Sequence, residues 1–82
     1  ASLAPLTEKE TSEYLELRVR AAGAKASLFR PAASAKVFEK TRGVPREINN
    51  LATAALFGAA AASKRHVDAA EVEDAFFDQV NA

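Results

Sequence analysis

The sequence contains no cysteine and only one histidine, and these two absences exclude several kinds of site. Without cysteine there is no disulfide bond, no thiolate nucleophile and no cysteine zinc site. His66 alone cannot form a histidine cluster, so we expect no metal site in this chain. No apolar run approaches the roughly 20 residues that a membrane span needs, and residues 1–6 lack the pattern of a signal peptide. The sequence favours a cytoplasmic location, with membrane attachment only through other domains of a larger parent protein.

Glycine is also scarce, and the three glycines, at positions 23, 43 and 58, stand alone. A loop that cradles phosphate needs a glycine-rich turn followed by lysine and serine or threonine, and no such segment occurs. His66 is not accompanied by the serine and strand-to-helix turn of a hydrolase site. We therefore expect no catalysis, and in particular no ATP hydrolysis, from this chain alone.

What the sequence has in abundance is alanine, which supplies twenty of its forty hydrophobic residues. With 82 residues, 49% of them hydrophobic, the chain is long enough for one small core, and an alanine-rich core favours closely packed helices. The 11 basic and 11 acidic residues cancel, so no overall basic field points to nucleic acid. Their distribution is uneven, because residues 23–66 carry eight basic and two acidic groups whereas 67–82 carry five acidic groups and no basic one.

Helix start and stop signals predict four helices, at residues 7–22, 31–41, 45–63 and 68–79. The start signals are the capping boxes Thr7/Glu10 and Asp68/Glu71 and the first-turn prolines Pro31 and Pro45; the stop signals are Gly23 and Gly43. The short connections predict an all-α, compact four-helix bundle that fills residues 1–82 as one domain.

The apolar pattern predicts how these helices pack. The third helix is apolar around most of its circumference, so we expect it to be central. Gly58 inside it suggests that a neighbouring helix passes closely over that point. In the first helix, Tyr14, Leu15, Leu17, Val19, Ala21 and Ala22 are expected on one apolar side. Arg18 falls within that side, and we expect it to extend to solvent or to pair with an acidic residue of the fourth helix.

Arg46 is the most informative residue, because it lies in the first turn of the third helix, where a cation opposes the helix dipole. The backbone N–H groups of a helix start and the guanidinium of arginine both suit phosphate. An ion pair with Glu39 or Glu47 is the alternative, and the spacing does not decide between them.

Four other polar residues could contact DNA or a partner protein. Asn49 and Asn50 either bond to neighbouring connections or read bases from a groove. Lys64 and Arg65, beside His66, form a basic patch that is either a solvated loop or a contact surface.

The segment GVPREINNLATAAL, residues 43–56, resembles the C-terminal helical lid of AAA+ ATPases, most closely that of ExeA-like proteins. That group includes general secretion pathway protein A and the TniB-like ATPases of transposition systems. The resemblance extends over nearly the whole chain: Leu3 to Thr11 resembles the segment that leaves the nucleotide-binding core, and Tyr14 to Gly23, Leu28-Phe29 and Val67 to Phe76 match further family patterns.

The resemblance implies a lid subdomain, a fragment of an ATPase whose N-terminal core is not present. Within it, residues 43–46 resemble the GxPR element of the family. In that element the arginine, here Arg46, is the second sensor and reaches the γ-phosphate of ATP, while Gly43 and Pro45 shape the turn. It further implies ATP with magnesium in a parent protein that forms homo-oligomers and serves secretion or transposition. Arg30 departs from the family, where serine or threonine often precedes the proline.

Two other functions remain open from the residues alone. In a helix-turn-helix DNA-binding module, the third helix would present Arg46, Asn49 and Asn50 to bases. In a plain interaction bundle, the phenylalanine-rich fourth helix would dock on another protein.

Overall fold

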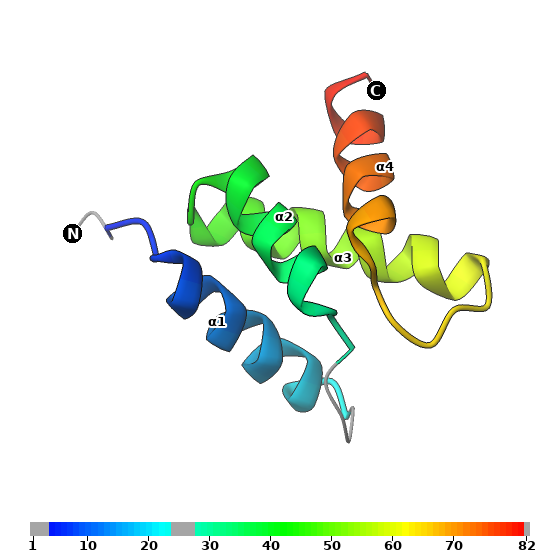
Figure 1. Ribbon diagram of the computed structural model, residues 1–82, viewed down its shortest axis with the longest axis horizontal. Helices are drawn as coiled ribbons and strands as arrows, with labels where there is room; N and C mark the ends of the chain where they lie inside the picture. Colours follow the sequence, from blue (N-terminus) through cyan, green and yellow to red (C-terminus); the bar gives the residue numbers. More distant parts are fainter. Residues whose placement is uncertain (1–3, 24–27, 82) are drawn as a thin grey trace.

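Four α-helices make up the protein: α1 (Glu8–Ala21), α2 (Pro31–Thr41), α3 (Pro45–Ala61) and α4 (Ala69–Val80), shown in Figure 1. The computed structural model describes residues 4–23 and 28–81, so Leu3 and residues 24–27 lie outside the described part. The predicted all-α class is confirmed, and each predicted helix end lies within two residues of the observed one.

The predicted caps explain this agreement. At the start of α1, the N–H of Glu10 donates to Thr7 Oγ1 at 3.1 Å, and the N–H of Thr7 donates to Glu10 Oε1 at 2.9 Å. At the start of α4, the N–H of Asp68 donates to Glu71 Oε1 at 2.8 Å. Each bond satisfies a backbone group that a helix start leaves open, so these boundaries are fixed locally.

The middle of the bundle is formed by α2 rather than by α3, which is a correction to the predicted arrangement. In Figure 1, α2 lies between α1 and α4 and crosses α3, and it packs against all three, whereas α3 packs chiefly on α2 and α4. The result is a flat molecule with principal extents of 39 × 33 × 19 Å. The core consists of Leu15, Val19, Phe29, Ala33, Val37, Ile48, Leu51, Ala52, Ala55, Ala59, Val67, Val72 and Ala75.

Two packing predictions from the apolar pattern are wrong. Gly58 is exposed, and a Cβ built on it would have no neighbour within 4 Å, so no helix passes over it. On α1 the buried positions are Thr11, Leu15 and Val19, spaced by four residues along one stripe, while Leu17 is 67% exposed. The buried stripe of α1 is narrower than predicted because α1 packs mainly on α2.

The connections before α2 and α4 lie side by side, a contact that the sequence did not predict. Phe29 and Val67 form an isolated parallel bridge, in which the N–H of Val67 donates to the Leu28 carbonyl at 2.7 Å and the N–H of Arg30 donates to the Val67 carbonyl at 3.0 Å. Phe29 and Val67 are also buried, at 6% and 1% exposure. The bridge therefore fixes the starts of α2 and α4 relative to each other.

Candidate functional site

The turn between α2 and α3 is built from two consecutive residues in the left-handed region. Arg42, which ends α2, has φ 55°, and Gly43 has φ 83°. Val44 then returns to extended backbone, and Pro45 begins α3 with the φ that its ring imposes. The sequence predicted Gly43 as the left-handed residue that ends α2. In the structure Arg42 is left-handed as well, so both residues form the end of the helix.

The N-terminal segment lies directly against this turn. The N–H of Leu6 donates to the Gly43 carbonyl at 2.8 Å, and a Cβ on residue 43 would overlap the backbone of Leu6. Figure 1 shows the N-terminal segment and the α2–α3 turn at the same end of the molecule. Gly43 thus allows a close approach of two backbones as well as the positive φ.

Thr41 holds the turn from inside. Its buried Oγ1 donates to the Val37 carbonyl at 2.8 Å and accepts from the N–H of Gly43 at 3.3 Å. The turn is therefore fixed on both sides, by Thr41 from the core and by Leu6 from the surface.

A comparison of two buried threonines tests this bracing of the turn. Thr41→Val leaves the N–H of Gly43 without its acceptor and should lower the free energy of unfolding by about 1–2 kcal/mol. Thr11, fully buried in α1, has no hydrogen-bond partner for its Oγ1 among the described residues, so Thr11→Val should be neutral or stabilising by up to about 1 kcal/mol. Urea unfolding of both variants measures the difference, and equal effects would contradict the assignment.

Arg46 lies exposed in the first turn of α3 and forms no ion pair with any residue in the ranges 4–23 and 28–81. The alternative partner Glu39 is paired with Lys36 at 3.4 Å and Lys40 at 3.8 Å. Among the described residues, no side chain caps α3. The alternative ion pair of Arg46 with Glu39 or Glu47 is therefore not formed, and the Arg46 side chain is exposed.

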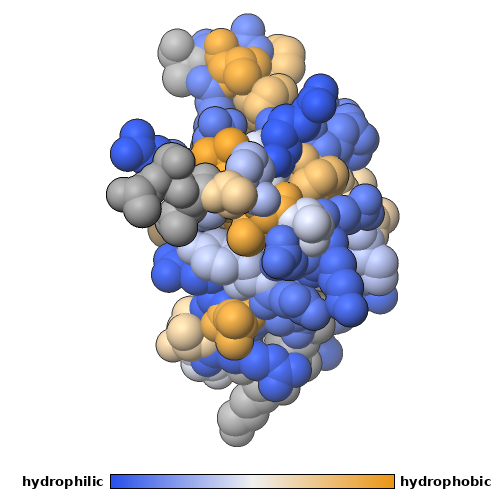
Figure 2. Space-filling model, turned by 90° about the vertical axis from the view of Figure 1, so that its left-hand side faces the viewer, coloured by the Kyte–Doolittle hydropathy of each residue, from blue (hydrophilic) through white to orange (hydrophobic). Residues whose placement is uncertain are grey.

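Figure 2 shows the end of the molecule that carries this turn, as a largely hydrophilic surface on which the apolar side chains form small, separate patches. Arg46, exposed and without an anionic partner in the described part of the chain, is accessible here to a charged ligand or to a second domain. We find no large apolar surface on this face that would compete for such a contact.

The two asparagines of α3 have different environments. Asn49 is partly buried, and its Oδ1 accepts from the Tyr14 hydroxyl at 2.9 Å, a bond that joins α1 to α3. Asn50 is exposed and lines a hollow of about 740 Å³ between α3, α4 and the end of α2, which Phe57 and Phe76 also border. One end of the Asn49 amide is therefore used inside the fold, whereas Asn50 is the more accessible of the two.

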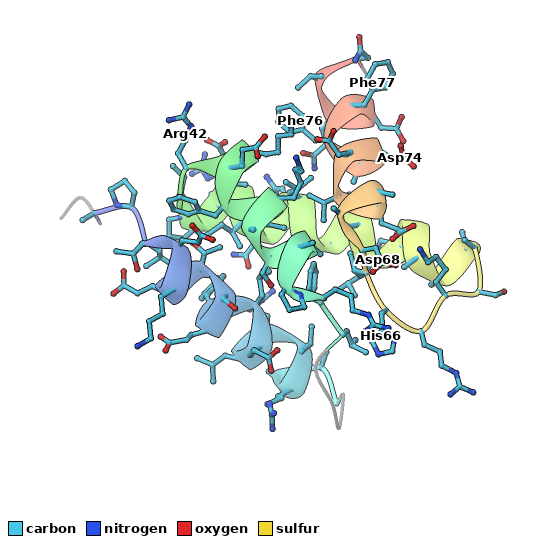
Figure 3. The ribbon with its side chains drawn as sticks, in the orientation of Figure 1. Arg42, His66, Asp68, Asp74, Phe76 and Phe77 are labelled. Atoms are coloured by element: carbon cyan, nitrogen blue, oxygen red, sulfur yellow. The ribbon has the colours of Figure 1, made fainter. Side chains whose placement is uncertain are left out.

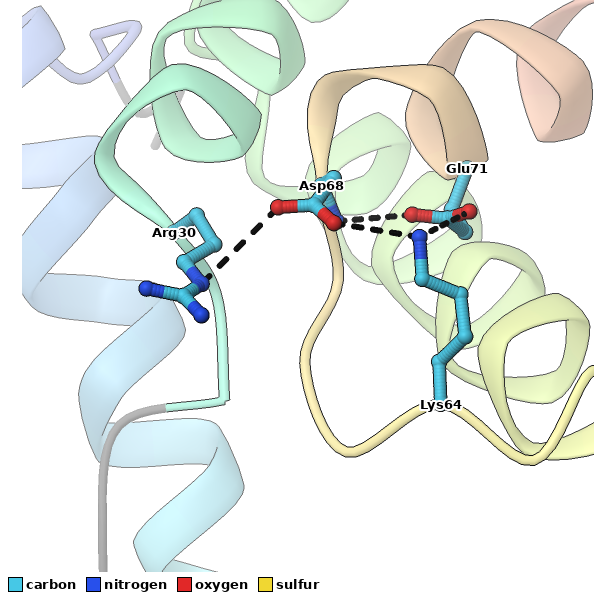
Figure 4. Close-up of polar contacts among 4 residues, drawn as sticks. All are labelled: Arg30, Lys64, Asp68 and Glu71. Carbon is cyan, nitrogen blue, oxygen red and sulfur yellow. Dashed lines mark hydrogen bonds and ion pairs between the residues drawn. The ribbon is translucent and has the colours of Figure 1, made fainter.

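Lys64 also forms ion pairs within the fold. Its Nζ lies 2.8 Å from Glu71 Oε2 and 3.0 Å from Asp68 Oδ2, and Arg30 approaches the other oxygen of Asp68 at 3.8 Å (Figure 4). This cluster bridges the starts of α2 and α4 and the end of α3. Arg65 is exposed and forms no ion pair in the described part of the chain, so the predicted patch of Lys64 and Arg65 contains one free cation rather than two.

The ion pairs shift three pKa values in directions that favour the charged forms. Hydrogen bonds to Glu71 and Asp68 raise the pKa of Lys64, and the bond from Lys64 lowers the pKa of Glu71 from its ordinary 4.5. The hydrogen bond from Lys40 lowers the pKa of Glu73 in the same way.

Acid should therefore weaken the bundle through these two carboxylates. A carboxyl group whose pKa is lower in the folded state stabilises the fold above its unfolded pKa, here 4.5, and loses that contribution as the pH falls through the folded value. Glu71→Gln, which keeps the cap acceptor, and Glu73→Gln should flatten the dependence of stability on pH below 4.5. Glu13→Gln is the control, since exposed Glu13 forms no ion pair in the described part of the chain. If stability depended on pH identically in all three variants, Glu71 and Glu73 would not be the source of the acid sensitivity.

Arg18 does not pair with α4, as the sequence suggested it could. It is exposed and borders a hollow of about 470 Å³ between α1 and α3, whereas α4 packs on α2 and α3. The solvent-directed alternative for Arg18 is the one that the structure shows.

Comparisons with protein-family models, with curated proteins and with solved structures returned no match for this chain. Within the described ranges, no three histidine, aspartate or glutamate side chains are grouped as a metal ion would require. None of the described helices has the length and apolar character to cross a membrane. The geometry of the α2–α3 turn and the sequence resemblance are therefore the features that bear on function.

Proposed function

We propose that this chain is the C-terminal lid subdomain of an AAA+ ATPase and that Arg46 is its second-sensor arginine. The observation that carries the proposal is the state of Arg46: an exposed guanidinium without an ion pair among the described residues, in the first turn of a helix that no side chain caps. A cation is intrinsically unfavourable there by a few tenths of a kcal/mol, and a phosphate would reverse that effect.

The path of the N-terminal segment supports the same function. In AAA+ proteins the segment resembling Leu3 to Thr11 leaves the nucleotide-binding core, and here Leu6 is hydrogen-bonded to Gly43 in the turn that leads to Arg46. A core that precedes this segment would therefore meet the end of the lid that presents the arginine. Gly43 and Pro45, the other two residues of the GxPR element, set the direction in which α3 begins.

The proposed mechanism divides the site between two domains. The core would hold ATP and magnesium, which supply the phosphoryl chemistry, because this chain has no phosphate-binding loop. Arg46 would contact the γ-phosphate by charge-assisted hydrogen bonds. The contact would report the nucleotide state by a rigid-body motion of the lid, since Leu6 and Thr41 fix the turn to both the entering segment and the core of the bundle.

The proposal is tested by Arg46→Ala in the ATPase that contains this chain. Loss of a hydrogen bond to a charged group should lower ATP turnover or ATP-dependent assembly by about 10- to 100-fold. Arg65→Ala is the matched control, because Arg65 is also exposed and has no ion pair among the described residues but lies after α3 rather than at its start. Circular dichroism should show both variants folded, and unchanged turnover and assembly in Arg46→Ala would contradict the assignment.

The reading frame upstream of Ala1 gives a second test. A phosphate-binding loop followed by an acidic magnesium motif is expected there. A frame that begins near Ala1 would contradict the proposal, as would duplex DNA binding by the isolated chain that weakens with salt and is lost in Arg46→Ala.

A further inference from the structure

The hollow of about 470 Å³ between α1 and α3 has the size of a small-molecule site, for which about 300–1,000 Å³ is usual. It is lined within residues 15–23 at the end of α1, residues 28–29, and residues 49–56 of α3, and we call it the α1–α3 groove. In Figure 1, α1 and α3 run in the same general direction and diverge, while α1 packs on α2. Each helical wall rises over seven residues, so the groove is about 10 Å long.

Most of the lining of the α1–α3 groove is apolar. Leu15, Val19, Phe29 and Ala52 form its buried part, each with an exposed fraction of 8% or less. Three more accessible apolar residues also line it: Ala22, Leu28 and Leu56. Water in this groove contacts mainly hydrocarbon, so an apolar ligand that displaces it gains the free energy of burying apolar surface.

Three polar side chains line the same groove: Arg18, Asn49 and Thr53. Arg18 is exposed and forms no ion pair with any residue in the described ranges. The Oδ1 of Asn49 accepts from the Tyr14 hydroxyl, and its NH₂ group donates to none of the described residues. Both the guanidinium and the amide NH₂ are donors, so together they fit an anionic head group.

Among the described residues, no carboxylate lines the α1–α3 groove. The hollows that contain Lys9, Arg30, Lys40 or Arg42 differ, because each also contains at least one glutamate. In the hollow between α3 and α4, moreover, Phe76 points toward α2 (Figure 3), where Lys40 Nζ already lies 4.9 Å from the centre of its ring. Of these five hollows, the α1–α3 groove is therefore the one that combines an unpaired cation with an apolar lining and no opposing charge.

We infer that the α1–α3 groove binds a small amphipathic anion, an unbranched carboxylate whose head group bonds to Arg18 and Asn49 and whose chain lies along the groove. The Tyr14–Asn49 bond joins α1 to α3, and Arg18 follows Tyr14 by one turn, so the head group lies at that end. The chain extends from there toward Ala22 and Leu56, where the two walls end. An extended chain suits the groove because its walls run together over about 10 Å.

An NMR titration of the amide signals of the 82-residue chain with octanoate tests the inference. The shifts should saturate at one octanoate per chain and be largest in residues 15–22 and 49–56. Octanol, which has the same chain without the charge, should bind at least about tenfold more weakly, because it cannot form charge-assisted hydrogen bonds. Arg18→Gln should weaken octanoate binding by a similar factor. Arg20→Gln is the matched control, since Arg20 is exposed on α1 but does not line the groove.

Two neighbouring alanines test whether the chain of the ligand occupies the groove. Ala21 and Ala22 are both exposed at the end of α1, but of the two only Ala22 lines the groove. Ala22→Phe should fill that end and abolish saturable binding of octanoate, whereas Ala21→Phe should leave it unchanged. Circular dichroism should show both variants folded.

The inference is overturned if octanoate gives no saturable shifts, if octanol binds as tightly, or if Arg18→Gln binds like the wild type. Vesicles of phosphatidylglycerol and phosphatidylcholine separate a free ligand from a lipid surface. Co-sedimentation of the chain with these vesicles, without binding of octanoate, would assign the groove to membrane head groups and overturn the inference as well. Arg46 does not line the groove, so octanoate binding and ATP turnover can fail independently of each other.

Discussion

Gly43→Ala is expected to destabilise the bundle by about 3 kcal/mol or more, since two independent costs add at this position. The φ of 83° costs an L-residue about 1–2 kcal/mol. The new Cβ would also overlap the backbone of Leu6, which cannot move without losing its hydrogen bond to the Gly43 carbonyl. Chemical unfolding of the isolated chain measures the loss, and the N-terminal segment should become more susceptible to proteolysis.

The other two glycines provide controls that separate the two costs. Gly23 has φ 101° but open space around it, so Gly23→Ala carries the conformational cost alone, about 1–2 kcal/mol. Gly58 lies exposed inside α3 with neither a positive φ nor a neighbour, so Gly58→Ala should stabilise by up to about 1 kcal/mol. If Gly43→Ala and Gly23→Ala lowered the free energy of unfolding equally, the close approach of Leu6 to Gly43 would not be a steric constraint.

Helix positions were predictable because the signals that set them act over a few residues. The Thr7/Glu10 box, the Asp68–Glu71 bond and the prolines at 31 and 45 each fix a helix start through the groups beside it. None of these signals depends on which helix packs against which. The sequence therefore predicted the number and limits of the helices, and the all-α class with them.

The packing was less predictable, because alanine and glycine carry little information about the side that is buried. The apolar circumference of α3 suggested a central helix, yet its Phe57 is 73% exposed and its Gly58 meets nothing. Contacts between distant segments, such as Leu6 with Gly43 and Phe29 with Val67, have no local signal at all. They depend on the relative positions of helices that a periodic pattern does not give.

In the candidate site, too, local features were predictable from the sequence and features that depend on tertiary packing were not. The sequence placed Arg46 in the first turn of α3, and the structure adds that Arg46 has no ion pair among the described residues, whereas Glu39 is paired with Lys36 and Lys40. The left-handed conformation of Arg42, one residue before the predicted helix-ending Gly43, became visible only in the structure. The position of Arg46 in its helix was therefore predictable from the sequence, whereas its exposure without an ion pair among the described residues was seen only in the structure.

Leu15→Ala should have an effect of similar size to Gly43→Ala, and its neighbour Leu17 provides the control. Leu15 is 1% exposed in the core, so truncation removes buried apolar surface, leaves a cavity and should cost about 2–5 kcal/mol. Leu17 is 67% exposed, and Leu17→Ala should change stability by less than about 0.5 kcal/mol.

This pair decides whether α1 is held by the narrow stripe of Thr11, Leu15 and Val19 or by the broad apolar side that the sequence suggested. A domain of this length has a total stability of about 4–12 kcal/mol, so Leu15→Ala should shift the urea midpoint strongly or unfold the chain. If Leu17→Ala were as destabilising as Leu15→Ala, both sides of α1 would be buried and the packing of α1 described above would be wrong. The two residues lie in the same helix, so helix propensity is matched and the difference reports burial alone.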